Sequence, residues 1–67
     1  MGRFQRGDHC KIEVGREFLW LYVRDSDDEA GLVFGRLDSE PVDNPDLRLG
    51  EELAVAYERV LDHRRFS

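Results

Sequence analysis

The side chains with the most reactive chemistry in this sequence are Cys10 and the two histidines, His9 and His63. A thiolate beside a histidine base can act as a nucleophile, and the same groups can ligate zinc. Adjacent residues of a strand point to opposite faces, so His9 is badly placed to activate Cys10. A structural zinc site takes four ligands in paired short spacings, which three scattered groups do not provide. We therefore predict no metal site, and a buried, apolar role for Cys10 on the face of Ile12 and Val14.

Other catalytic patterns are also missing from the sequence. It has no Gly-x-Ser-x-Gly nucleophile elbow and no glycine-rich phosphate loop. Carboxylates are abundant, but nothing marks one as desolvated, as acid–base catalysis requires. Arg6-Gly7-Asp8 matches the integrin-binding tripeptide, and we interpret it as a turn. We expect no catalytic residue and no cofactor, and predict that the protein is not an enzyme.

Two acidic segments are candidates for binding a basic protein partner. The first, residues 25–29, places four carboxylates in five residues, but its spacing is not that of an EF-hand, which needs Glu where Arg36 stands. We predict a solvated hairpin tip there. The second segment, residues 38–46, is a proline-containing loop that Pro41-Val42 would pin. The candidate partner-binding residues are Asp25, Asp27, Asp28, Glu29, Asp43 and Asp46.

Phe18, Trp20 and Tyr22 alternate along one segment and would share one face of a strand. Such a row can stack the bases of a single-stranded nucleic acid when basic side chains surround it. The acidic total charge opposes this, and we favour a place in the core for Trp20. The alternative, nucleic-acid-binding site consists of Tyr22, Arg24 and Arg36.

The elements that position these residues are predicted to be strands. Alternation over residues 10–14 indicates a half-buried strand, and Gly15-Arg16 a tight connection. The six apolar residues 18–23 are typical of a central strand covered on both faces. Residues 32–37 form a third strand, in which Gly35 marks a bulge or a close backbone approach.

The C-terminal segment allows two interpretations. Leu53, Val55 and Tyr57 alternate as in a strand. Local propensity and the charge order instead favour one helix from Glu51 to Arg65. In that case, the helix would lie across a three-stranded sheet.

Length and composition set the remaining limits. A chain of 67 residues has room for one domain, which we place at residues 10–67 behind a loose N-terminal arm, residues 1–9. The net charge of −5 argues against general attraction to phosphate backbones. No apolar run approaches the roughly 20 residues of a membrane span. A single cysteine fits a reducing compartment, so we expect a cytoplasmic protein, either a monomer or a homodimer.

Three segments together resemble a bacterial domain-of-unknown-function family: residues 17–23, 35–42 and 47–51. The family carries a Glu-x-x-Trp-Val-x-Val strand, a Gly-x-Leu-x-Asn-x-Pro turn and a Leu-x-x-Gly-Asp turn. Here Ser39 replaces the Asn and Glu51 the Asp.

The resemblance implies a strongly bent antiparallel sheet like an SH3-like barrel. It also implies a strand over residues 53–57 and a short closing turn at Val60-Leu61-Asp62. Some related domains are predicted immunity or regulatory proteins, and the family brings no catalytic residues. We therefore expect a mainly β fold and a non-enzymatic protein-interaction module, immunity-like or regulatory. The alternative is a single-stranded nucleic-acid-binding small β-barrel.

Overall fold

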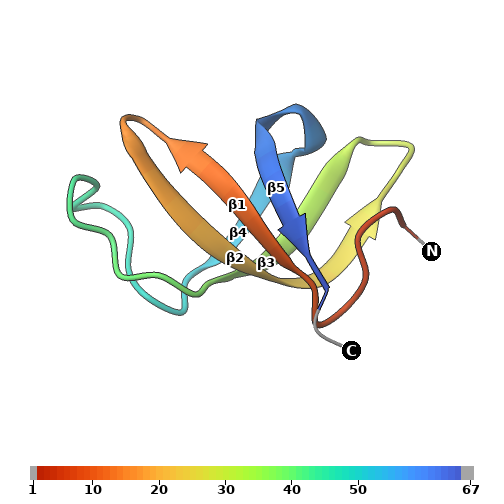
Figure 1. Ribbon diagram of the computed structural model, residues 1–67, viewed down its shortest axis with the longest axis horizontal. Helices are drawn as coiled ribbons and strands as arrows, with labels where there is room; N and C mark the ends of the chain where they lie inside the picture. The colour runs from red at the N-terminus through yellow and green to blue at the C-terminus, as the bar shows by residue number, and fades with distance from the viewer. Residues whose placement is uncertain (1, 66–67) are drawn as a thin grey trace.

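Strand-forming residues and tight turns build one antiparallel sheet with the order β4-β3-β2-β1-β5 (Figure 1). The strands are β1 (His9–Val14), β2 (Glu17–Asp27), β3 (Leu32–Leu37), β4 (Glu52–Ala56) and β5 (Val60–Arg64). The structure, a computed structural model, describes residues 2–65. Residues 1, 66 and 67, which the predicted arm and domain include, lie outside the described part. The prediction of a mainly β fold is confirmed.

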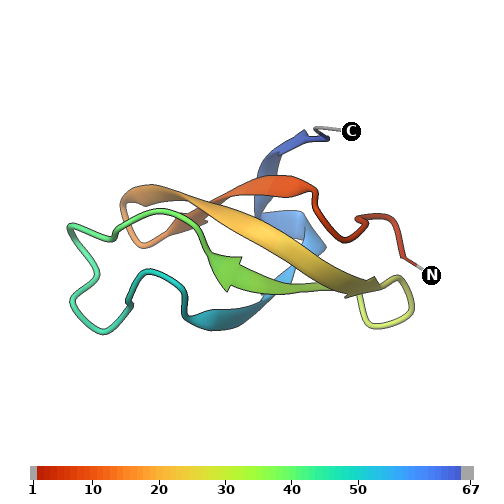
Figure 2. The ribbon, with the colours of Figure 1, turned by 90° about the horizontal axis from the view of Figure 1, so that it is seen from below.

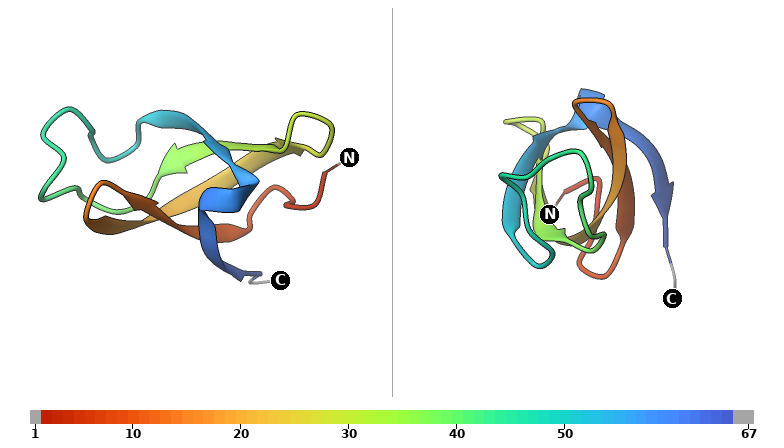
Figure 3. Two further views of the ribbon diagram at one scale, coloured as in Figure 1. Left: turned by 90° about the horizontal axis from the view of Figure 1, so that it is seen from above. Right: turned by 90° about the vertical axis from the view of Figure 1, so that its left-hand side faces the viewer.

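The sheet is strongly bent but it is not closed into a barrel. Seen end-on in Figure 3, the strands curve around a common interior. β4 and β5 each pair on one side only, with β3 and β1 respectively, so they are the two edges of the sheet. The expected small barrel is therefore present only as an open, curved sheet.

The inner face of the bend holds the hydrophobic core. Alternation places every second side chain of β1 and β2 on this face, as the sequence pattern predicts. Most of the core side chains are Leu, Ile and Val, which fit the narrow interior. The buried apolar residues are Phe4, Cys10, Ile12, Leu19, Leu21, Val23, Val33 and Leu37.

The outer face of β2 is not covered, so the prediction of a central strand buried on both faces is wrong. Leu19, Leu21 and Val23 fill the inner face. Trp20 lies on the opposite face and is only half-buried, and Phe18 is 56% exposed. The expected place of Trp20 in the core is corrected accordingly. The reason is that β5 and the arm complete the core from the inner side, and no element crosses the outer side among the described residues.

The N-terminal arm is ordered, contrary to the expected loose segment. Phe4 is 4% exposed, and its N–H and carbonyl both hydrogen-bond the hydroxyl of Ser26. A turn at residues 5–8, closed by the Asp8 N–H on the Gln5 carbonyl, confirms the turn interpretation of Arg6-Gly7-Asp8. The arm then pairs with Val23 through two backbone hydrogen bonds.

The acidic stretch after the central apolar run belongs mostly to β2 and not to a hairpin tip. The pairing of β2 with β3 shifts at Arg24, which has no partner opposite it. This bulge moves the alternation by one residue, so Ser26 points inward and Asp25 outward. Opposite the bulge, a Cβ on Gly35 would lie 2.3 Å from the Tyr22 carbonyl oxygen, which confirms the predicted close backbone approach.

The C-terminal segment forms two strands, so the single helix that local propensity favours is wrong. β4 confirms most of the strand expected over residues 53–57. The helical turn lies at Tyr57–Arg59, and residues 60–62, expected as the closing turn, begin β5. Pairing of β5 with β1 and of β4 with β3 supplies the hydrogen bonds that outweigh helix propensity. No helix within residues 2–65 is long and apolar enough to cross a membrane.

The long loop between β3 and β4 is held at its far end by Glu17. The carboxylate accepts the N–H groups of Val42 and Asp43 and a hydrogen bond from the Asn44 amide. Hydrogen bonding to Asn44 and Val42 lowers the pKa of Glu17. The side chain of Val42 itself is 83% exposed, so it does not pin the loop as expected.

Candidate functional site

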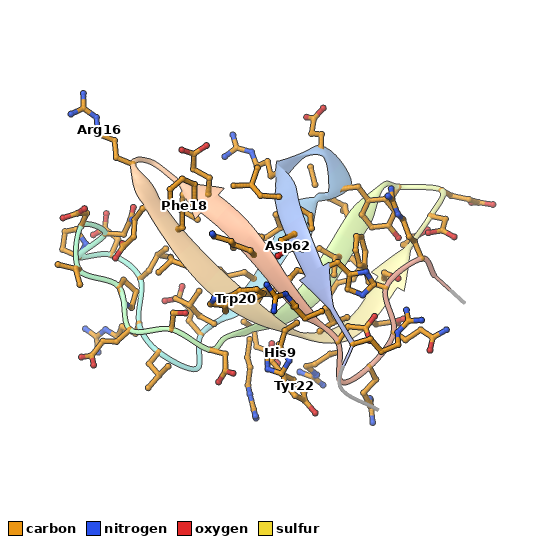
Figure 4. The ribbon with its side chains drawn as sticks, viewed as in Figure 1. His9, Arg16, Phe18, Trp20, Tyr22 and Asp62 are labelled. Atoms are coloured by element: carbon orange, nitrogen blue, oxygen red, sulfur yellow. The ribbon has the colours of Figure 1, made fainter. Side chains whose placement is uncertain are left out.

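The outer face of β2 carries three aromatic side chains in succession, Phe18, Trp20 and Tyr22, which we call the aromatic row (Figure 4). Successive same-face residues of a strand lie about 6.6 Å apart, so the row offers three evenly spaced rings. The row runs from the β1–β2 turn to the bulge at Arg24.

Each ring of the aromatic row has a cationic group beside it. The Lys11 ammonium lies 5.1 Å from the Phe18 ring centre. The central guanidinium carbon of Arg64 lies 6.0 Å from the Trp20 ring centre, and that of Arg36 lies 4.7 Å from the Tyr22 ring centre. These distances are in the range of cation–π contacts. The rings of β2 are thus flanked by cations from β1, β3 and β5.

At the Tyr22 end, the face opens into a shallow pocket that contains three arginines. Its lining consists of Arg6, Tyr22, Arg24, Arg36 and Glu52, and we call it the arginine pocket. Tyr22 and Arg36 are cross-strand partners, and Arg24 forms an ion pair with Glu52 of β4. The structure therefore brings together Tyr22, Arg24 and Arg36, the residues predicted for the nucleic-acid alternative.

Carboxylates on the same face neutralise part of this positive charge. Asp62 lies 3.3 Å from the Nε of Arg64. Asp38 lies 3.2 Å from the Nε2 of His9, whose ring packs edge-on against Tyr22. The face is consequently mixed in charge, in a protein whose net charge is −5.

The predicted acidic partner-binding residues do not form one surface. The turn at residues 28–31 and the loop that holds Asp43 and Asp46 lie at opposite ends of the molecule, whose longest dimension is 32 Å (Figures 1 and 2). Several of these carboxylates also hold the fold. Asp27 accepts hydrogen bonds from the N–H groups of Glu29 and Ala30. Asp28 accepts hydrogen bonds from the Tyr57 hydroxyl and the Arg3 backbone N–H. The Tyr57 hydrogen bond lowers the pKa of Asp28.

A buried carboxylate, Asp8, joins the arm to the C-terminal strand. It is 2% exposed and accepts a hydrogen bond from the Gln5 N–H. Two nitrogens of the Arg65 guanidinium group, Nε and Nη2, also donate to it, each at 3.0 Å. The fourth hydrogen bond joins it to His63 Nε2 at 2.7 Å. The Arg65 hydrogen bonds hold the pKa of Asp8 well below its usual range. Because the carboxylate can only accept, Nε2 of His63 carries the proton. We call Asp8, His63 and Arg65 the Asp8 cluster.

The Asp8 cluster lies next to Cys10, but it does not make this cysteine a nucleophile. Cys10 pairs with His63 across β1 and β5 and is fully buried. Burial raises the pKa of the thiol to about 11, whereas a nucleophilic cysteine needs a lowered pKa. Within residues 2–65, no three His, Cys, Asp or Glu side chains are grouped as metal ligands would be.

Sequence reasoning missed three cations of this face, Arg6, Lys11 and Arg64, of which Lys11 lies on a strand that was predicted. The place of Arg64 on this face depends on β5, a strand that local helix propensity does not predict. The place of Arg6 on this face depends on the arm, whose sequence has no periodic pattern. The only indication of its position in the sequence is the turn-forming pair Gly7-Asp8 that follows it.

Comparisons with known proteins find no relative of this chain. No family model matches the chain, and neither the curated proteins nor the solved structures contain a match. The resemblance to the bacterial family therefore stays a prediction.

Proposed function

We propose that this protein is a non-catalytic module that binds single-stranded nucleic acid on the outer face of its sheet. The observation that carries the proposal is the aromatic row with a cation beside each ring. RNA-binding sheets stack two or three successive bases on rings of this kind. Each stacked base contributes about 1–3 kcal/mol, and arginines beside the rings can contact phosphates.

The composition of the face favours a polyanion over a protein partner. Protein–protein interfaces are also rich in aromatic residues and arginine, but they are depleted of lysine and carboxylates. Here, Lys11 lies over one ring, and Asp38 and Asp62 lie on the same face as the row. The acidic loops expected to meet a basic protein lie far apart, so one partner would have to span the molecule to contact both.

The single tryptophan provides the test, because Trp20 is the central ring of the aromatic row. We expect a single-stranded oligothymidylate of about ten nucleotides to quench Trp20 fluorescence at low salt. Phe18→Ala removes one exposed platform and should weaken binding about 5- to 150-fold. Phe18 is exposed enough that its truncation leaves the core intact.

Val42→Ala is the matched control, since it truncates an exposed apolar side chain at the far loop. Its affinity should equal that of the wild type. If no oligonucleotide binds at low salt, or if Phe18→Ala binds as well as Val42→Ala, the proposal is wrong. A protein partner would then be the remaining occupant of this face.

A further inference from the structure

The aromatic row ends at Tyr22, and the arginine pocket begins at the same side chain. The next outward position of β2 is Arg24, at the bulge, so no fourth ring of β2 continues the row. Phe34 of β3, which is 37% exposed, lines the adjoining hollow with Arg6 and Arg24. A nucleic-acid strand whose bases stack along the aromatic row would reach the three guanidinium groups only at one end of the nucleic acid. The question is which chemical group of a nucleic acid the pocket would receive.

The third guanidinium is supplied by the turn of the arm. The backbone of the turn is fixed, because Gly7 has a φ of +94° and donates its N–H to the Val23 carbonyl. Gly7 lies against Tyr22: a Cβ built on it would be 4.0 Å from the Tyr22 hydroxyl. Asp8 is anchored in the Asp8 cluster, and Arg6 is left exposed to line the pocket.

The charge of the pocket matches a phosphomonoester. Three arginines and one carboxylate, Glu52, give a formal charge of +2. A terminal phosphate carries about −1.5 to −2 at pH 7 and three unbridged oxygens, whereas an internal phosphodiester carries a single charge. Asp25 lines the adjoining hollow, which shares Arg6, Arg24 and Glu52 with this pocket, and counting its carboxylate still leaves a formal charge of +1. Arginine is also the side chain best suited to phosphate, since it can donate two parallel hydrogen bonds.

We propose that the arginine pocket binds the terminal phosphate of the single strand that lies along the aromatic row. This inference rests on the proposed function and goes beyond it, because it assigns a chain end to one end of the sheet. Binding requires the phosphate to compete with Glu52 for Arg24. Arg6 and Arg36 are available to it without that exchange, since the described residues form no ion pair with either.

The test compares three decathymidylates that differ only at their ends: one with two terminal hydroxyls, one with a 5′-phosphate and one with a 3′-phosphate. We expect one phosphorylated form to bind about tenfold more tightly than the hydroxyl form. Arg6→Gln should abolish that gain and leave the affinity for the hydroxyl form within about twofold. The end that shows the gain gives the polarity of the strand.

Arg16→Gln is the matched control, because Arg16 is an exposed arginine beyond the opposite, Phe18 end of the row (Figure 4). It should keep the phosphate gain. Equal binding of all three oligonucleotides would overturn the inference and leave the proposed function standing. A gain that survives in Arg6→Gln would also overturn it. Failure of every oligonucleotide to bind would defeat the proposed function itself.

Discussion

Asp8 is the residue on which both the fold and the arginine pocket depend. It is almost fully buried and ionised, and its partners come from the arm and from the C-terminal strand region. A carboxylate in such surroundings is costly to bury unless every oxygen is satisfied. Here, four donors satisfy it, and the turn that presents Arg6 is fixed as a result.

Asp8→Asn should therefore destabilise the protein by about 2 kcal/mol, measured by urea unfolding. The charged hydrogen bonds of Asp8 are lost, but Arg65 and His63 are partly exposed, so water recovers some of the cost. Asp62→Asn is the control, since Asp62 is an exposed carboxylate that also pairs with an arginine. Its effect should be clearly smaller than that of Asp8→Asn, because the pair is solvent-exposed. Equal losses in the two variants would contradict the role given to Asp8.

The same residue should shape the stability of the protein in acid. The folded-state pKa of Asp8 is lowered, so its carboxylate stabilises the fold above its unfolded-state pKa of about 3.9. This contribution is lost as the pH falls below about 4. The stabilities of wild type and Asp8→Asn should thus converge between pH 5 and pH 2. Parallel curves over that range would show that the pKa of Asp8 does not differ between the folded and unfolded states.

At the scale of elements, the loop between β3 and β4 depends on a carboxylate of β2. Glu17→Ala removes the acceptor of the Val42 and Asp43 N–H groups. We expect hydrogen exchange at these two amides to become at least about tenfold faster, while the sheet amides are unchanged. Glu13→Ala, an exposed carboxylate at the end of β1, is the control. Unchanged exchange at Val42 and Asp43 would contradict this role of Glu17.

The strands could be predicted from the sequence where side chains alternate. The pattern at Cys10, Ile12 and Val14 gave β1, and the face shared by Leu19 and Leu21 is the buried one. Periodicity does not tell how many faces are covered, which is why Trp20 was misplaced. The aromatic row itself was predicted, together with Tyr22 as part of the candidate site.

The remaining elements depend on contacts that are distant in the sequence. β5 exists because β1 offers it hydrogen bonds some 50 positions earlier in the chain. Phe4 stands alone in a polar arm, and its burial follows from Ser26 and the ring of Tyr57. No window of local sequence contains these partners, so local reasoning predicts a helix and a loose arm instead.

The whole molecule separates its charges along its longest axis. Acidic segments lie at both ends, and the aromatic row with its cations lies on the sheet between them. An approaching polyanion is repelled by the ends and attracted by the centre. These charges therefore restrict the orientation of the polyanion on the outer face before it contacts any ring.

This arrangement sets the salt dependence of binding. One terminal phosphate in the arginine pocket and one phosphate each at Lys11 and Arg64 make three phosphate contacts. They predict a slope of log Kobs against log salt of about −2, at roughly −0.7 per contact on single strands. Screening of the acidic ends acts in the opposite direction and makes the slope shallower. We expect values between 0 and about −2, measured by Trp20 quenching from 20 to about 300 mM salt. A slope steeper than about −4 would require more phosphate contacts than this face provides.

The contact of Asp8 with Arg65 has a consequence for the order of the strands in the chain. The segment that precedes β1 and the segment that follows β5 touch, and β1 and β5 are themselves neighbours in the sheet. Because the two chain ends of the sheet are adjacent, they can be joined, and the chain can be opened at another loop without changing the strand order in the sheet. A circular permutant that joins these two segments by a short linker and opens at the exposed loop near Val42 would keep every pairing of the sheet.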